Sequence, residues 1–175
     1  MSRLPAIDVT QLTPEQAAVF ESIRSGPRGQ VRGPFLALLH APDIASSIQS
    51  LGARLRFSGQ IPAGQREVVI LVVANFWKCN YEWVIHEADA RKAGVQEAML
   101  DAVRRGVPLG TNTPEGLVHD FTLELLTTGT VGQELYALAL DCLKPAGLVE
   151  VNVLIGYYTM LALVLNANEV QPPAL

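Results

Sequence analysis

The sequence predicts an almost entirely α-helical protein, and three observations support this fold class. Most segments repeat their apolar residues at the three- and four-residue spacing of one helix face. Several of them begin behind a Thr, Asp or Asn suited to an N-cap and stop at a glycine. Only residues 66–77 carry a continuous β-branched run that would suit a buried strand. The expected fold is therefore an all-α helical bundle.

Two helices are predicted in the N-terminal third. Thr13 precedes a proline and a glutamate, which is typical of a helix start, and the apolar spacing continues to Gly26. This pattern predicts a helix near 14–25. Asp43 opens a second apolar stripe that ends at a glycine, which predicts a helix near 43–58.

The middle of the chain contains one ambiguous segment and one clear helix. Periodicity alone cannot assign residues 66–77, and the local pattern slightly favours a strand. Residues 81–92 have a helical pattern between Asn80 as N-cap and Gly94 at the position of a left-handed C-cap. Further helices are predicted at 96–104, 114–126, 131–143 and 146–167.

Length and composition limit the classes of function. With 175 residues the chain fits a single domain, expected over 1–175 with a core of about 14–168. Hydrophobic residues make up 49% and charged residues 17%, which excludes disorder. The net charge of −4 without an extended basic cluster argues against a nucleic-acid partner. The mean hydropathy of +0.25 predicts apolar subunit interfaces and a homo-oligomer.

The cysteines and the apolar runs indicate the cellular compartment of the protein. Cys79 and Cys142 are too few for a disulfide framework, and the first residues show no signal peptide, so we expect a cytoplasmic protein. The longest apolar run, 153–165, has 13 residues, whereas a membrane span needs about 20. We therefore expect a buried core helix and no membrane partner.

A thiol, a carboxylate and an imidazole share one face of the predicted helix 81–92 and its start. Cys79, Glu82 and His86 stand at positions i, i+3 and i+7. An imidazole titrates near neutrality, and a carboxylate one turn away can orient it and raise its basicity for acid/base catalysis. The simpler alternative is a solvated i,i+4 pair on an ordinary helix.

Five motifs in order resemble one protein family. They are GPFxxLxHxPxIA at 33–45, the pair Arg66-Glu67 before an apolar run, YEWxxH at 81–86, AxxAGV at 90–95 and VExxxLIGYYxMxAxxLNA at 149–167. Together they resemble the carboxymuconolactone decarboxylase family, which shares a superfamily with the alkylhydroperoxidase D (AhpD) proteins. The resemblance implies a helix for 66–77 as well, and a homotrimer or homohexamer.

The cysteine pattern separates the two branches of this superfamily. The hydroperoxidase branch has a glutamate, a CxxC pair and a histidine. Glu67 matches the glutamate, Cys79 the first cysteine and His86 the histidine. Glu82 occupies the position of the second cysteine, and a carboxylate cannot resolve a disulfide. Cys142 belongs to another predicted helix, where we expect it in the core. A dithiol peroxidase is therefore disfavoured.

The decarboxylase branch has the EWxxH form found here. The resemblance implies cofactor-free loss of CO2 from a small lactone or oxo carboxylic acid of aromatic catabolism. Arg66 would bind the substrate carboxylate through a bidentate fork, and His86 would act as acid/base, oriented by Glu82 or Glu67. The alternative is that Arg66 and Glu67 form only a solvated first helical turn.

Two further side chains are weaker substrate-binding candidates. Trp83 could line a wall of the pocket, although aromatic residues of this kind more often lie in cores or interfaces. His40 could edge the pocket, although a loop histidine bonded to the backbone is the simpler interpretation.

Two other functions and a metal site are alternatives to the lyase. A thiol-dependent antioxidant would use Cys79 with an external thiol, and a repurposed family member would catalyse neither reaction. A divalent ion needs three or four converging ligands, and no second histidine stands at ligand spacing from His86. We therefore expect neither a metal nor a cofactor.

Overall fold

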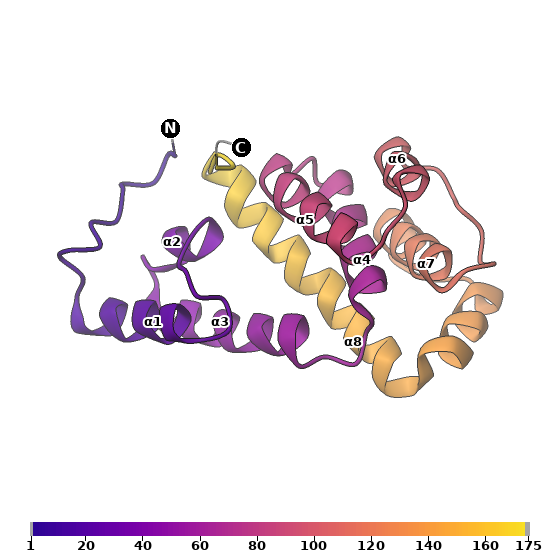
Figure 1. Cartoon of the computed structure of the whole chain (residues 1–175), viewed down its shortest axis with the longest axis horizontal. Coiled ribbons are helices and arrows are strands. Elements are labelled where there is room, and N and C mark those ends of the chain that lie inside the picture. The colour runs from indigo at the N-terminus through magenta and orange to yellow at the C-terminus, as the bar shows by residue number, and fades with distance from the viewer. Residues whose placement is uncertain (1, 174–175) are drawn as a thin grey trace. The chain divides into compact units, whose positions relative to one another are not determined.

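The computed structural model describes residues 2–173, and the part it describes contains eight helices and no strand (Figure 1). The all-α prediction is confirmed. The chain forms two compact units, one made of the residues up to Gly59 with those from Leu163 onward, the other of Gln60–Ala162. The single domain expected over 1–175 stays a prediction.

The first unit contains α1 (Pro14–Ser25), α2 (Pro34–Leu38) and α3 (Pro42–Phe57). The predicted start of α1 is confirmed, because the Thr13 hydroxyl accepts a hydrogen bond from the backbone N–H of Gln16 and the Gln16 side chain accepts one from Thr13. The predicted N-cap Asp43 is wrong: α3 begins at Pro42, which places Asp43 in its first turn.

The second unit is built around α4 (Ala63–Phe76), which packs against α5 (Asn80–Lys92), α6 (Glu97–Arg105) and α7 (Pro114–Thr128) (Figure 1). Every residue from Glu67 to Ala74 is buried. A helix buried on all sides needs no polar face, so its sequence loses the helical period. The strand favoured by the local pattern at 66–77 is therefore wrong, and the helix implied by the family resemblance is right.

The turn between α4 and α5 places Cys79 at the start of α5. The Cys79 N–H donates to the Ala74 carbonyl at 2.8 Å, and Lys78 adopts a φ of 53°. Cys79 is the N-cap of α5, so the predicted cap Asn80 is wrong by one residue. Gly94, after α5, has a φ of 86°, as predicted for a left-handed C-cap.

The last helix, α8 (Gln133–Ala167), is interrupted at Lys144 and Pro145, where the two predicted helices meet. By length and composition α8 could cross a membrane, and half of its most apolar window is buried within the structure. The expectation that Cys142 lies in the core is wrong, because its side chain is exposed.

Candidate functional site

Three buried ionisable side chains meet where α4 packs on α5. Glu67 comes from α4, and Glu82 and His86 come from one face of α5; their exposed fractions are 2%, 4% and 2%. The alternative of a solvated Glu82–His86 pair is therefore wrong. Charged groups are rarely buried unless they are paired, and here each of the three has a partner among the others.

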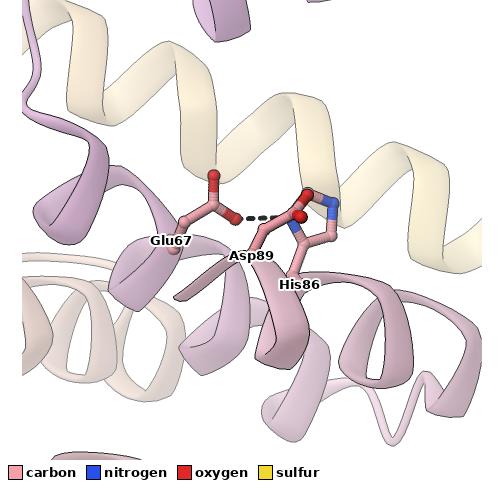
Figure 2. Close-up of side chains that lie close together, drawn as sticks. All are labelled: Glu67, His86 and Asp89. Carbon is pink, nitrogen blue, oxygen red and sulfur yellow. Dashed lines mark hydrogen bonds and ion pairs between the residues drawn. The ribbon is translucent and has the colours of Figure 1, made fainter. Parts of the chain in front are cut away.

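The two nitrogens of the His86 ring face two different carboxylates. Nδ1 lies 2.6 Å from Oε2 of Glu67, a hydrogen bond drawn in Figure 2. Nε2 lies 3.2 Å from Oε2 of Glu82. The Tyr158 ring, from α8, packs against the imidazole in a T-shaped arrangement, with the ring centroids 5.1 Å apart and the ring planes at 87°. Both nitrogens of the His86 ring are thus held by carboxylates, and the Tyr158 ring packs against it.

These contacts favour the protonated imidazolium. Burial opposes the charged ring and is the largest single influence on it. The hydrogen bonds and negative charges of Glu67 and Glu82 together outweigh burial and raise the pKa of His86 above its usual range. A doubly protonated ring can donate to both carboxylates at once.

Arg66 extends the cluster from the buried ring toward solvent. Its Nε donates to Oε1 of Glu67 at 3.3 Å, so the two oxygens of Glu67 serve Arg66 and His86 separately. The Arg66 side chain is partly buried, whereas that of Glu67 is buried. A solvated first turn of α4 is therefore the wrong interpretation for Glu67.

Cys79 lies at the start of α5 but offers little thiolate. Its side chain is buried, and this burial raises the pKa of the thiol to about 11, although the backbone N–H groups of Glu82 and Tyr81 favour the thiolate. Because the thiolate is the reactive species, this burial disfavours nucleophilic chemistry at Cys79.

Two predicted substrate-binding residues have other partners. The Trp83 indole N–H donates to Glu87 at 3.2 Å, and the Arg104 guanidinium lies 5.0 Å from the centre of the Trp83 ring. His40 belongs to the first unit, where its Nε2 lies 3.0 Å from the Pro5 carbonyl oxygen. The backbone-bonded loop histidine is thus confirmed for His40.

Asp89 is a residue of the site that the sequence analysis missed. Potential ligand atoms of Glu67, His86 and Asp89 all lie within 4.8 Å of one another (Figure 2). Asp89 follows His86 by three residues, and residues at this spacing lie on the same face of a helix, so the sequence could have indicated that the two side chains are neighbours. An imidazole nitrogen and two carboxylate oxygens are donors that divalent transition metals accept.

A cavity of about 280 Å³ lies elsewhere in the second unit. It is lined by Gly64, the residues 93–96, Met99, Thr113 and Glu115, of which only Glu115 is ionisable. It brings no acid and base together. We therefore locate the candidate site at Glu67, Glu82 and His86, where charged groups converge.

Comparison with known proteins gives one family and several similar folds. Residues 42–108 match the carboxymuconolactone decarboxylase family, and no curated protein matches the sequence. The fold resembles two uncharacterized peroxidase-related proteins. The one from Ralstonia eutropha JMP134, an alkylhydroperoxidase AhpD core, has a TM-score of 0.80 and 18% identity over 98% of this chain and 92% of that one. The one from Silicibacter sp. TM1040 has a TM-score of 0.77 and 19% identity over 99% of this chain and 92% of that one.

A third structure, a protein of unknown function from Agrobacterium tumefaciens, has a TM-score of 0.66 and 16% identity over 82% of this chain and 100% of that one. At such identities these likenesses establish a shared helical fold. They leave the reaction to be argued from the residues of the site.

Proposed function

Because the family match and the AhpD-type fold support membership of the carboxymuconolactone decarboxylase/AhpD-like superfamily, we propose that this protein is a cofactor-independent lyase for a small lactone or oxo carboxylic acid. The observation that carries the proposal is the His86 ring, held at both nitrogens by buried carboxylates. Such a ring is an oriented proton donor and acceptor.

The two distances around His86 suggest a division of roles. The short contact to Glu67, 2.6 Å, fixes Nδ1, whereas the longer contact to Glu82, 3.2 Å, holds Nε2 less tightly. We assign Glu67 as the orienting residue and Nε2 as the nitrogen that transfers the proton. The Glu82 carboxylate accepts the hydrogen bond of the Nε2–H group until the substrate takes its place.

The proposed reaction breaks the bond between the substrate carboxylate and the neighbouring carbon. CO2 leaves, and the electron pair of that bond remains on the organic fragment as an enolate. The Nε2 proton of His86 then forms a new bond to carbon, and solvent restores the proton on the ring. The raised pKa of His86 favours the protonated ring that donates this proton.

Arg66 is the proposed site of substrate binding. Its Nε is committed to Glu67, so a substrate carboxylate would meet the outer nitrogens of the guanidinium. Arg66 and Glu67 are adjacent in α4, so a carboxylate bound there lies beside the His86 cluster.

A thiol-dependent peroxidase is the second candidate. It is favoured by the two similar folds that are described as peroxidase-related. The thiol pKa of about 11 and the carboxylate at Glu82, in place of a resolving cysteine, oppose it. A repurposed enzyme that catalyses neither reaction is the third candidate.

Two variants separate these candidates. His86→Gln removes the proton donor and should lower the turnover of lactone acid decarboxylation, measured as CO2 release, by about 10²–10⁴-fold. Cys79→Ser keeps the donor and should retain most of that turnover, while it abolishes any peroxide consumption followed by stopped flow.

Loss of both activities in Cys79→Ser would make the thiol central and would reject the lyase assignment. Wild-type turnover in His86→Gln would reject the acid/base role. Failure of the wild-type protein to decarboxylate any lactone or oxo acid would leave only the repurposed enzyme or the peroxidase.

A further inference from the structure

We propose that Glu67, His86 and Asp89 form a binding site for one divalent transition-metal ion, a property that does not depend on the proposed lyase activity. Potential ligand atoms of these three side chains lie within 4.8 Å of one another, and Figure 2 shows them converging from α4 and α5. The sequence alone predicted no metal, because a divalent ion needs three or four converging ligands and no second histidine stands at ligand spacing from His86. Asp89 supplies the third ligand.

The donor set suits a transition metal better than calcium or magnesium. An imidazole nitrogen with two carboxylate oxygens is a set that Zn²⁺, Co²⁺, Mn²⁺ and Fe²⁺ accept at about 2.0–2.2 Å. Ca²⁺ and Mg²⁺ prefer oxygen ligands alone. The ion would replace the proton that Nδ1 of His86 shares with Oε2 of Glu67, so those two atoms need only small movements to bind it.

Each of the three ligands is also held by an outer partner. Glu82 faces the other nitrogen of His86 at 3.2 Å, and Arg66 donates to the other oxygen of Glu67 at 3.3 Å. A metal-bound histidine usually donates its second N–H to a carboxylate, and bound carboxylates are themselves hydrogen-bonded. Such contacts orient the ligands before the ion arrives.

The third outer partner is Lys92, whose Nζ donates to Oδ1 of Asp89 at 3.1 Å. Among the ligands, Asp89 has the most exposed side chain, at 30%, whereas the other two are buried. Asp89 therefore marks the side from which an ion enters. Three protein ligands leave the remaining coordination positions to water or a small anion.

Metal binding displaces the proton from Nδ1 of His86, because a histidine ligand binds an ion as the neutral imidazole. Three carboxylates, Glu67, Glu82 and Asp89, then face two basic side chains, Arg66 and Lys92. The carboxylates of the cluster then outnumber its basic side chains by three to two, and this balance favours a cation.

Metal binding is tested on the whole chain without substrate. The protein is stripped with a chelator and titrated with Zn²⁺ by calorimetry and with Co²⁺ by its visible absorption. We expect one ion for each chain. Asp89→Asn, which removes the exposed ligand, should weaken binding by about 100-fold or more, because it removes a direct ligand where the loss of outer partners alone costs about 10–100-fold.

Asp141→Asn is the matched control. Like Asp89, Asp141 pairs with a lysine three residues later, but it belongs to α8 and is no ligand of the proposed site, so Asp141→Asn should bind the ion as the wild type does. Glu82→Gln keeps all three ligands and loses the charged outer partner, so its affinity should fall by about 10–100-fold.

Absence of stoichiometric Zn²⁺ and Co²⁺ binding in the wild type would overturn the proposal, as would equal affinity in Asp89→Asn and the wild type. Since Asp89 is partly exposed, its substitution does not empty the buried core, and a thermal unfolding curve confirms that the variant is folded. These results stand whether or not the protein is a lyase.

Discussion

The carboxylates on either side of His86 do not contribute equally to its charge. The contact to Glu67 is 2.6 Å and that to Glu82 is 3.2 Å, and the shorter hydrogen bond has the larger influence on the ring. Because both raise the pKa of His86, removing either charge lowers it. Glu67→Gln should therefore lower the pKa of His86 more than Glu82→Gln does.

This difference is measurable by NMR titration of the His86 ring in the two variants and the wild type. An equal effect of the two substitutions, or a larger one for Glu82→Gln, would contradict the assignment of Glu67 as the orienting residue.

The raised pKa of His86 also links stability to pH. The folded protein holds a proton on His86 at pH values where the unfolded chain, with a histidine pKa near 6.5, has lost it. The stabilisation is therefore complete below about pH 6.5 and declines as pH rises through the higher folded value.

The measurement is the free energy of urea unfolding as a function of pH. We expect the wild type to lose stability on the alkaline side of about pH 6.5 and His86→Gln to show a flatter curve there. A parallel decline in both proteins would assign the loss to other groups.

Residue spacing predicted part of this site. The i,i+4 relation of Glu82 and His86 follows from the sequence, but their burial does not, since the same spacing occurs on solvated helices. The contact between Glu67 and His86 joins two helices, so no local pattern contains it, and the family resemblance supplied it. Asp89 was missed because its spacing to His86 is equally common on exposed helices.

Among the secondary-structure elements, capping residues and amphipathic spacing predicted most helices within a few residues. They failed for α4, because a helix enclosed by α5, α6 and α7 is apolar on every side and shows no period. They also missed α2, because its five residues are too few to show a helical period. Both failures concern elements whose surroundings are set by tertiary packing.

The turn between α4 and α5 contains a testable source of strain. Lys78 has a φ of 53° directly before Cys79, a conformation that costs a residue with a side chain about 1–2 kcal/mol relative to glycine. Lys78→Gly should therefore raise the free energy of unfolding by about 1 kcal/mol, measured in urea, after the entropy of the unfolded glycine is subtracted.

Lys78→Ala is the control for this turn, because it removes the long side chain but keeps the Cβ that causes the strain. It should show no comparable gain. If both variants gain equally, the lysine side chain and not the backbone angle is the destabilising feature.

At the scale of the whole molecule, the apolar excess of the sequence has a counterpart on α8. Val149 and Val153 lie one turn apart on this helix and are 61% and 39% exposed. Gly156 continues the same face, and a Cβ added there would have no atom within 4 Å apart from its chain neighbours and the backbone of its own helix. Exposed apolar faces of this kind mark association sites, and a glycine lets a second backbone approach closely.

We predict that this face of α8 packs against a second copy of the chain in a homotrimer or homohexamer. Light scattering of the wild type at micromolar concentration should give at least three times the chain mass of 18.9 kDa. Val149→Glu combined with Val153→Glu places two charges in the apolar face, and because buried unpaired charges are costly, the assembly should dissociate to the monomer mass. Val107→Glu adds a charge at another exposed valine and should leave the mass unchanged. A wild-type monomer, or a double variant that keeps the full mass, would show that the face does not join subunits.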